Sequence, residues 1–181
     1  QNKRPLMWVE FAAAALVTHP KSRFILVGDG NLFKATQNYA EELGIADRCL
    51  FVGKSKNVGF WMSKMNALGL FSRLEGLPNV LIEAQLSGIP VISTPAGGAS
   101  EAFIPDRTGF LLGSTEQPQL SEFLRFYLSL SNAPDRCQSM GTAASAFAMQ
   151  NFGMNTILPQ TLRLLAAVPE VSASQKSVAF G

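Results

Sequence analysis

The sequence of 181 residues predicts an α/β domain with a parallel sheet, helices on both faces, and a helical C-terminal third. Three observations support this fold class. Continuous apolar runs such as residues 23–27 are typical of strands buried on both faces. These runs alternate with segments of helical periodicity over the first two thirds of the chain. The connections are short, and each contains Gly or Pro.

Each element follows from local signals. Pro in a first turn and Gly after a last turn delimit helices with apolar residues at helical spacing. The helices are predicted at residues 5–18, 31–43, 57–66, 78–87, 99–103, 117–130, 134–150 and 154–168. Short apolar runs between them predict strands at residues 23–27, 49–52, 67–71, 90–93 and 109–112. Residues 1–169 therefore form the predicted domain, and residues 170–181, polar and mostly small, form a tail.

Composition limits the classes of function. An apolar share of 47% is ample for a core, and a net charge of +2 is too small to indicate a nucleic-acid partner. No apolar run approaches the ~18 residues of a membrane span, and the start lacks both Met and a signal peptide. We interpret the start as lying inside a longer reading frame. Two distant cysteines and one histidine predict no metal site.

The most informative stretch is residues 72–83, with the sequence SRLEGLPNVLIE. It leaves an apolar strand, passes a Gly-Pro turn and opens a helix, with Pro78 expected in the first helical turn. Glu75 and Glu83 bracket the free N–H groups at the helix start, namely those of Leu77, Asn79 and Val80. This pattern predicts an anion site between two hydrogen-bond acceptors. A nucleotide sugar has phosphates between two hydroxyl-bearing rings and suits such a site.

Four glycine turns are expected at one rim of the sheet. In doubly wound sheets the ligand binds beyond the carboxyl ends of the strands, where these turns fall. The turns are Gly28-Asp29-Gly30, Gly53-Lys54, Glu75-Gly76 and Ala96-Gly97-Gly98. Their common position predicts a binding site better than any one of them does.

The segment EGLPNVLIE at residues 75–83 closely resembles the nucleotide-binding half of retaining, GT-B-fold glycosyltransferases of family 4 (glycosyl transferases group 1). Two glutamates separated by seven residues are that family's signature. The resemblance continues over roughly residues 3–168, through FILVGDG at 24–30, LFVG at 50–53, GIPVIST at 88–94 and TGFLL at 108–112. It implies a Rossmann-like, donor-binding domain of an enzyme that transfers a sugar with retention at the anomeric carbon.

The resemblance also implies roles for individual residues. Glu75 would contact the transferred sugar and Lys3 the diphosphate, which places both at the reacting end. Glu83 would accept hydrogen bonds from the ribose. The remaining donor-binding positions are the backbone N–H groups of Gly76, Leu77, Asn79 and Val80, the diphosphate rim at Gly28 and Gly30, the base contacts Gly53 and Lys54, and the turn Gly97-Gly98. The family needs no metal and no cofactor.

The sequence also departs from the family. The central first strand, its phosphate-binding arginine and the N-terminal acceptor-binding half are absent from these 181 residues. We therefore expect the isolated domain to bind nucleotide weakly and to transfer nothing. Residues 176–181 resemble the missing strand, and an irregular tail is the alternative. The resemblance further implies polysaccharide biosynthesis, a cytoplasmic location and an acceptor associated with the inner membrane face.

Two other functions stay open at this point. One is a different enzyme on the GT-B fold, a nucleotide-sugar epimerase or a phosphorylase-like enzyme. The other is a non-catalytic module that binds a nucleotide or another protein. The intact pair of Glu75 and Glu83 favours the transferase over both.

Overall fold

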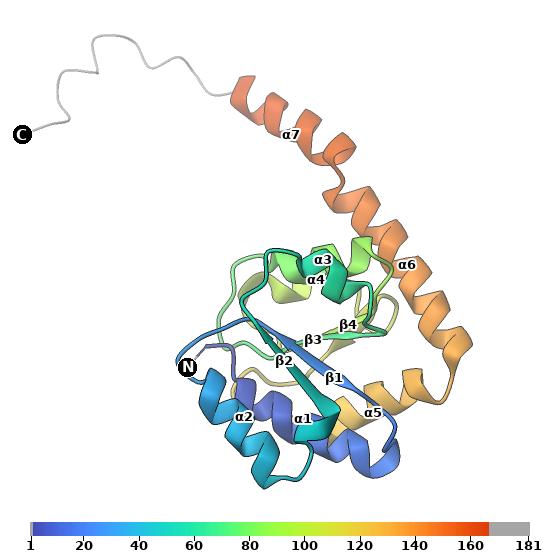
Figure 1. Ribbon diagram of the computed structural model, residues 1–181. Helices are drawn as coiled ribbons and strands as arrows, with labels where there is room; N and C mark the ends of the chain where they lie inside the picture. The colour runs from blue at the N-terminus through green and yellow to red at the C-terminus, as the bar shows by residue number, and fades with distance from the viewer. Residues whose placement is uncertain (1, 167–181) are drawn as a thin grey trace, which may run out of the picture.

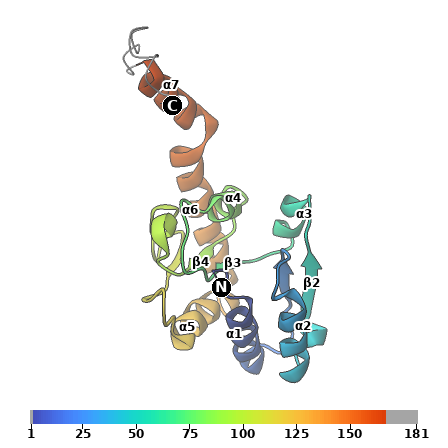
Figure 2. The ribbon, with the colours of Figure 1, turned by 90° about the vertical axis from the view of Figure 1, so that its left-hand side faces the viewer.

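The computed structural model describes residues 2–166, and Figures 1 and 2 show how its elements are arranged. The helices lie at α1 Pro5–Thr18, α2 Phe33–Glu42, α3 Val58–Met62, α4 Asn79–Leu86, α5 Leu120–Ser131, α6 Pro134–Phe152 and α7 Met154–Ala166. The strands lie at β1 Phe24–Val27, β2 Cys49–Gly53, β3 Leu68–Leu70, β4 Val91–Ser93 and β5 Gly109–Leu111. Two 3₁₀ turns, η1 Ala46–Arg48 and η2 Gly97–Glu101, complete the fold.

All strand pairs are parallel, as predicted, but the strands form two sheets instead of one. β1 pairs with β2, and β4 lies between β3 and β5. β1 is followed directly by Gly28, and β2 ends at Gly53. The predicted α/β class with parallel pairing is therefore confirmed, with the strands divided between two sheets.

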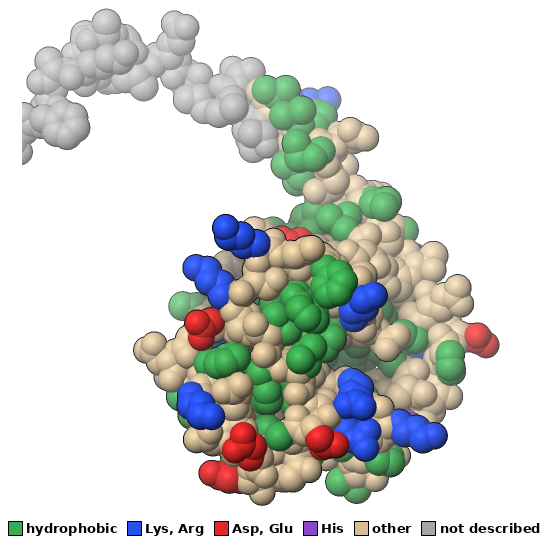
Figure 3. All heavy atoms as spheres, viewed as in Figure 1, with side chains coloured by type: hydrophobic (Ala, Val, Ile, Leu, Met, Phe, Trp, Pro, Cys, Tyr) green, Lys and Arg blue, Asp and Glu red, His purple; other side chains and the backbone are tan. Residues whose placement is uncertain are grey.

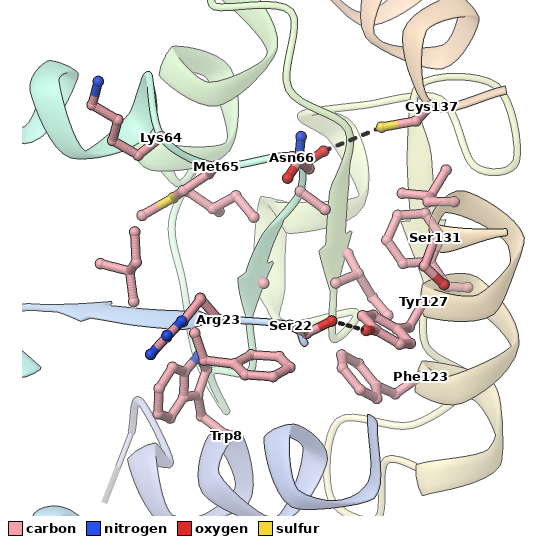
Figure 4. A pocket seen from close by; sticks show the side chains of 18 of the residues that line it. Trp8, Ser22, Arg23, Lys64, Met65, Asn66, Phe123, Tyr127, Ser131 and Cys137 are labelled. Atoms are coloured by element: carbon pink, nitrogen blue, oxygen red, sulfur yellow. Dashed lines mark hydrogen bonds between the residues drawn. The ribbon is translucent and has the colours of Figure 1, made fainter. Parts of the chain in front are cut away.

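A cavity of about 850 Å³ separates the two sheets. The start of β1 and the residues around β3 line opposite sides of it, and Trp8 and Phe123 contribute side chains from α1 and α5 (Figure 4). The break lies where the family resemblance implies a central strand that the sequence analysis places outside the 181 residues. The alternative occupant, residues 176–181, lies outside the described residues.

Helices cover both faces of the β3–β4–β5 sheet because neighbouring residues of β4 point to opposite sides. Ile92 packs into a cluster with Phe11, Phe71 and Phe123, which joins α1 and α5 to the sheet. The Phe11 ring lies 4.6 Å from that of Phe123 and 4.8 Å from that of Phe71, measured between centroids. Val91 packs on the other side, in a cluster with residues of α3, α4 and η2. The predicted helices on both faces are confirmed.

α1 connects the two sheets through a second contact surface. Its residues Val9 and Ala12 are buried with Ala40 of α2, and Trp8 makes edge contacts with Phe24 of β1 and Phe51 of β2. One helix therefore holds β1–β2 and β3–β4–β5 in one body. At the other end, α6 packs against α4 and α5, and α7 extends beyond this body (Figure 1). Within residues 2–166, no helix is both long and apolar enough to span a bilayer.

Several element boundaries differ from the prediction. α3 ends at Met62 instead of residue 66 because the N–H groups of Lys64 and Met65 bond to carbonyls three residues back, which forms a turn. α5 begins at Leu120 instead of residue 117 because Pro118 disfavours a helical Gln117. η2 begins at Gly97, two residues before the helix predicted there, and is a 3₁₀ turn.

Candidate functional site

The predicted site centres on the motif loop, residues 71–78, which connects β3 to α4. Pro78 is the N-cap residue of α4, directly before the first helical turn in which it was predicted. In the described part of the chain, the N–H groups of Gly76, Leu77, Asn79 and Val80 donate no hydrogen bond outside α4. A helix start with free N–H groups carries partial positive charge and suits an anion.

The motif loop places Glu75 against the start of the chain. The Lys3 ammonium donates to the Glu75 carboxylate, although the two residues are 72 positions apart. The Glu75 side chain is only 12% exposed, whereas that of Lys3 is 61% exposed. Glu83 lies in the second turn of α4 and is exposed. The two glutamates thus differ in environment, one held in an ion pair and one open to solvent.

The turn Gly97-Gly98 lies directly against the motif loop. A Cβ atom on Gly97 would come within 1.9 Å of the Glu75 carbonyl oxygen, and one on Gly98 within 2.8 Å of the Gly76 oxygen. Gly97 also has a φ of +54°, a conformation that glycine adopts more easily than other residues. Only glycine at these positions allows the close approach, so the turn shapes the loop at Glu75 and Gly76.

The turns at Gly28 and Gly53 come together at the carboxyl ends of β1 and β2. The Gly28 N–H donates to the Gly53 carbonyl at 2.8 Å, and both glycines have positive φ. The Gly30 N–H is turned toward its neighbour Asp29, whose carboxylate accepts it, and Lys54 is exposed. Among residues 2–166, no hydrogen bond links this pair of turns to the motif loop.

Three side chains at the site were not predicted from the sequence. Asn2 and Arg4 flank Lys3 and bond to the backbone of the motif loop. Gln85 is completely buried in α4, where its Nε2 donates to the carbonyls of Leu81 and Ala102. Polar residues beside a predicted ligand were the available signal for Asn2 and Arg4. A glutamine on the apolar face of a predicted helix was the signal for Gln85.

Arg4 adopts an uncommon conformation to make its contacts. Its φ of 45° and ψ of 57° are left-handed, which costs about 1–2 kcal/mol for a residue with a Cβ. Nε donates to the Phe71 carbonyl at 2.6 Å and a terminal nitrogen to the Ser72 carbonyl at 2.9 Å. Burial and the nearby charge of Arg73 lower the pKa of Arg4. The hydrogen bonds offset both unfavourable effects.

Neither a metal centre nor the large cavity competes with the motif loop in the described part of the chain. Among the described residues, no three His, Cys, Asp or Glu side chains gather in a way that could hold a metal ion. The 850 Å³ cavity is lined by none of the predicted site residues. On the face shown in Figure 3, Lys and Arg side chains are interspersed with hydrophobic and acidic ones. The motif loop therefore remains the candidate site.

Residues 7–145 match the family model described as glycosyl transferases group 1. The chain belongs to this family. A Vi polysaccharide biosynthesis protein, VipC/TviE of Salmonella typhi, is 44% identical over 168 residues, which are 93% of this chain and 29% of that protein. The N-acetyl-alpha-D-glucosaminyl L-malate synthase of Bacillus anthracis is 37% identical over 100 residues, 55% of this chain and 26% of that protein.

Solved glycosyltransferase structures share the fold, and the predicted half of a GT-B fold is confirmed. HepE of Anabaena, crystallised with UDP, is 25% identical and superposes with a TM-score of 0.78 over 93% of this chain and 47% of that chain. TarM superposes with a TM-score of 0.80 at 18% identity, over 91% of this group 1 domain and 32% of that chain. The domain thus spans less than half the length of each of these four proteins.

Proposed function

We propose that this group 1 domain binds the donor of a glycosyltransferase that moves a sugar from a nucleotide diphosphate to an acceptor with retention. The observation that carries the proposal is the meeting of Lys3 and Glu75 beside the free N–H groups of Gly76 and Leu77. A cation from the start of the chain, next to the carboxylate and the free N–H groups of the motif loop, suits a diphosphate joined to a hydroxylated ring.

In the proposed reaction the bond between the anomeric carbon and the diphosphate oxygen breaks, and a bond to an acceptor oxygen forms. The diphosphate leaves with the electron pair, so negative charge grows on its oxygens. Lys3 and the N–H groups at the start of α4 would stabilise that charge where it develops. Glu75 would orient the sugar through its hydroxyls, and Glu83 would accept hydrogen bonds from the ribose.

The other predicted positions complete the proposed site. Gly97 and Gly98 pack against the backbone of the motif loop at Glu75 and Gly76. Gly28 and Gly30 would border the diphosphate, and Gly53 and Lys54 would border the base. HepE was crystallised with UDP, which makes UDP the first nucleotide to test. Because transfer requires a positioned acceptor, the whole reaction is proposed for a longer protein that includes an acceptor-binding domain.

The proposed setting follows from two further observations. The relative that is 44% identical is named for polysaccharide biosynthesis, which supports a growing polysaccharide or its membrane-associated precursor as acceptor. Both cysteines, Cys49 and Cys137, are free, as suits a protein in the reducing cytoplasm. An epimerase would convert the nucleotide sugar into its epimer, and a phosphorylase-like enzyme would use phosphate to release a sugar phosphate, so product analysis of the full-length enzyme separates these activities from transfer.

Titration calorimetry with UDP tests the proposal directly. Replacing Glu83 by Ala should weaken UDP binding about 10- to 100-fold, since hydrogen bonds to a charged group contribute about 1.5–3 kcal/mol. The matched control is Glu41→Ala, which removes an exposed carboxylate from α2. A wild-type chain that binds no UDP, GDP or other nucleoside diphosphate would refute the donor-binding proposal. Equal UDP affinity for Glu83→Ala and wild type would refute the ribose contact.

A further inference from the structure

We propose that Asn2 and Arg4 are positioning residues for the donor site, acting as a clamp that holds the motif loop so that Lys3 and Glu75 face one ligand. The inference rests on the proposed function. The three consecutive residues Asn2, Lys3 and Arg4 all contact the motif loop, which begins about 70 positions later. The outer two bind its backbone, and the middle one binds its carboxylate.

Asn2 forms hydrogen bonds to the backbone of Arg73 and Leu74 through its side-chain amide and its own carbonyl. Its Nδ2 donates to the Leu74 carbonyl at 2.7 Å, and its Oδ1 accepts from the Leu74 N–H at 2.7 Å and the Arg73 N–H at 3.1 Å. The Asn2 carbonyl also accepts from the Arg73 N–H at 2.9 Å. Both ends of the amide are thus used, which defines the side chain's orientation as well as its position.

Arg4 holds the loop where it leaves β3. Its guanidinium donates to the Phe71 and Ser72 carbonyls through two different nitrogens. A planar fork that bridges two successive carbonyls determines the direction of the loop, which a single point charge cannot do. Thr94 supports the same position, since its hydroxyl also donates to the Ser72 carbonyl.

The ion pair by itself cannot position the loop. Lys3 is 61% exposed, and solvent weakens exposed pairs. A long lysine side chain also reaches many positions. The clamp, by contrast, consists of the residues on both sides of Lys3, and it binds backbone atoms of the motif loop. The position of the loop relative to the start of the chain therefore does not depend on the side chains that the loop carries. The exposed side chains of Arg73 and Leu74 are free to vary under this arrangement.

The test uses the 181-residue chain with Asn2→Ala, Arg4→Ala and Arg4→Lys, and with Arg73→Ala as the matched control. The control removes a charged side chain from the loop and keeps the N–H that Asn2 binds. UDP and uridine are titrated against each variant. We expect Asn2→Ala and Arg4→Ala to weaken UDP binding at least tenfold. Uridine binding should stay within twofold, because Glu83 lies on α4, whose buried residues pack in a cluster that contains neither Asn2 nor Arg4.

Arg4→Lys separates geometry from charge. A lysine keeps the positive charge and loses the fork, so we expect it to bind UDP as weakly as Arg4→Ala. Wild-type UDP affinity in Arg4→Lys would show that Arg4 acts by its charge alone and would overturn its positioning role. Unchanged UDP affinity in both alanine variants would overturn the clamp altogether.

Amide hydrogen exchange tests the clamp without any nucleotide. Asn2 Oδ1 is the acceptor for the Leu74 N–H, whereas the Arg73 N–H also bonds to the Asn2 carbonyl. Asn2→Ala should therefore speed exchange at Leu74 at least tenfold and at Arg73 less. Unchanged exchange at Leu74 would overturn the clamp. If the wild-type chain bound no nucleotide, the donor role would fall with the proposed function, and exchange at Leu74 would still decide whether Asn2 holds the loop.

Discussion

Lys3 and Glu75 form an ion pair between the first residues of the chain and the loop that follows β3. In the proposed complex each would have a different partner, the diphosphate for Lys3 and the sugar for Glu75. The pair would therefore have to open when a donor binds. Substitutions of Lys3 and of Glu75 should therefore have opposite effects on the affinity for a nucleotide that carries no sugar.

Lys3→Ala should weaken UDP binding about tenfold, because a cation facing the diphosphate is lost. Glu75→Gln should keep UDP affinity at or above the wild-type value, since it removes a negative charge and releases Lys3. Calorimetry measures both, with Lys21→Ala as a control for general loss of positive charge. Melting temperatures should barely change, because the Lys3 side of the pair is 61% exposed and ion pairs open to solvent contribute about 0–1 kcal/mol to stability. Parallel losses of UDP affinity in both variants would contradict this arrangement.

Gly97→Ala should displace the motif loop, because its Cβ would overlap the Glu75 carbonyl oxygen and its φ is positive. We expect a loss of about 1–3 kcal/mol in the free energy of unfolding, together with weaker UDP binding. Urea denaturation and titration measure the two effects.

Gly59→Ala is the matched control for Gly97→Ala. Gly59 lies in α3, where nothing comes within 4 Å of an added Cβ, and alanine favours a helix by about 0.8–1 kcal/mol over glycine. This variant should be as stable as wild type or more stable. If Gly97→Ala behaved like Gly59→Ala, the close approach to Glu75 would be wrong.

Variants of the buried Gln85 should differ in their free energy of unfolding in a definite order. Its Nε2 donates two hydrogen bonds in the interior, whereas its Oε1 has no partner in the described part of the chain. Gln85→Met removes both donors and the unpaired oxygen, so a loss of about 1–3 kcal/mol is expected. Gln85→Glu would place a carboxylate beside two carbonyls and should cost more at pH 7.

Lowering the pH should reduce the cost of Gln85→Glu, since a protonated carboxyl can donate to one of those carbonyls. Urea denaturation at pH 5 and pH 7 checks the sign. The wild-type chain and Gln85→Met serve as references for any general effect of pH. A pH-independent cost in Gln85→Glu would contradict the burial of this side chain.

The raised pKa of the Cys49 thiol should lower the free energy of unfolding at alkaline pH. Burial, with a smaller effect of Asp47, raises the pKa of the Cys49 thiol to about 11 from the ordinary value of 9.0. Between these values the unfolded chain releases the proton and the folded chain keeps it, so stability falls as pH rises from 9 to 11. Cys49→Ala should flatten this part of the profile. At pH 8 the thiol should also react slowly with alkylating reagents.

Local signals in the sequence were enough for most elements of the fold. Short apolar runs located the five strands of the described residues, and helical spacing located α1 with its observed bounds. The same signals placed Glu75 in a loop and Glu83 in the second turn of α4. These features depend on residues close together in sequence, and their backbone preferences act before any long-range contact forms.

The tertiary structure decided which distant residues meet. No local pattern indicates that Asn2 and Arg4 bind the motif loop, that Gly97 touches Glu75, or that β1 and β3 are separated by a cavity. Such contacts depend on the path of the chain through the whole fold, and in particular on α1 packing against both sheets. Local signals in the sequence were therefore enough for the elements and for the two glutamates, whereas long-range packing sets how the motif loop is held before Glu75.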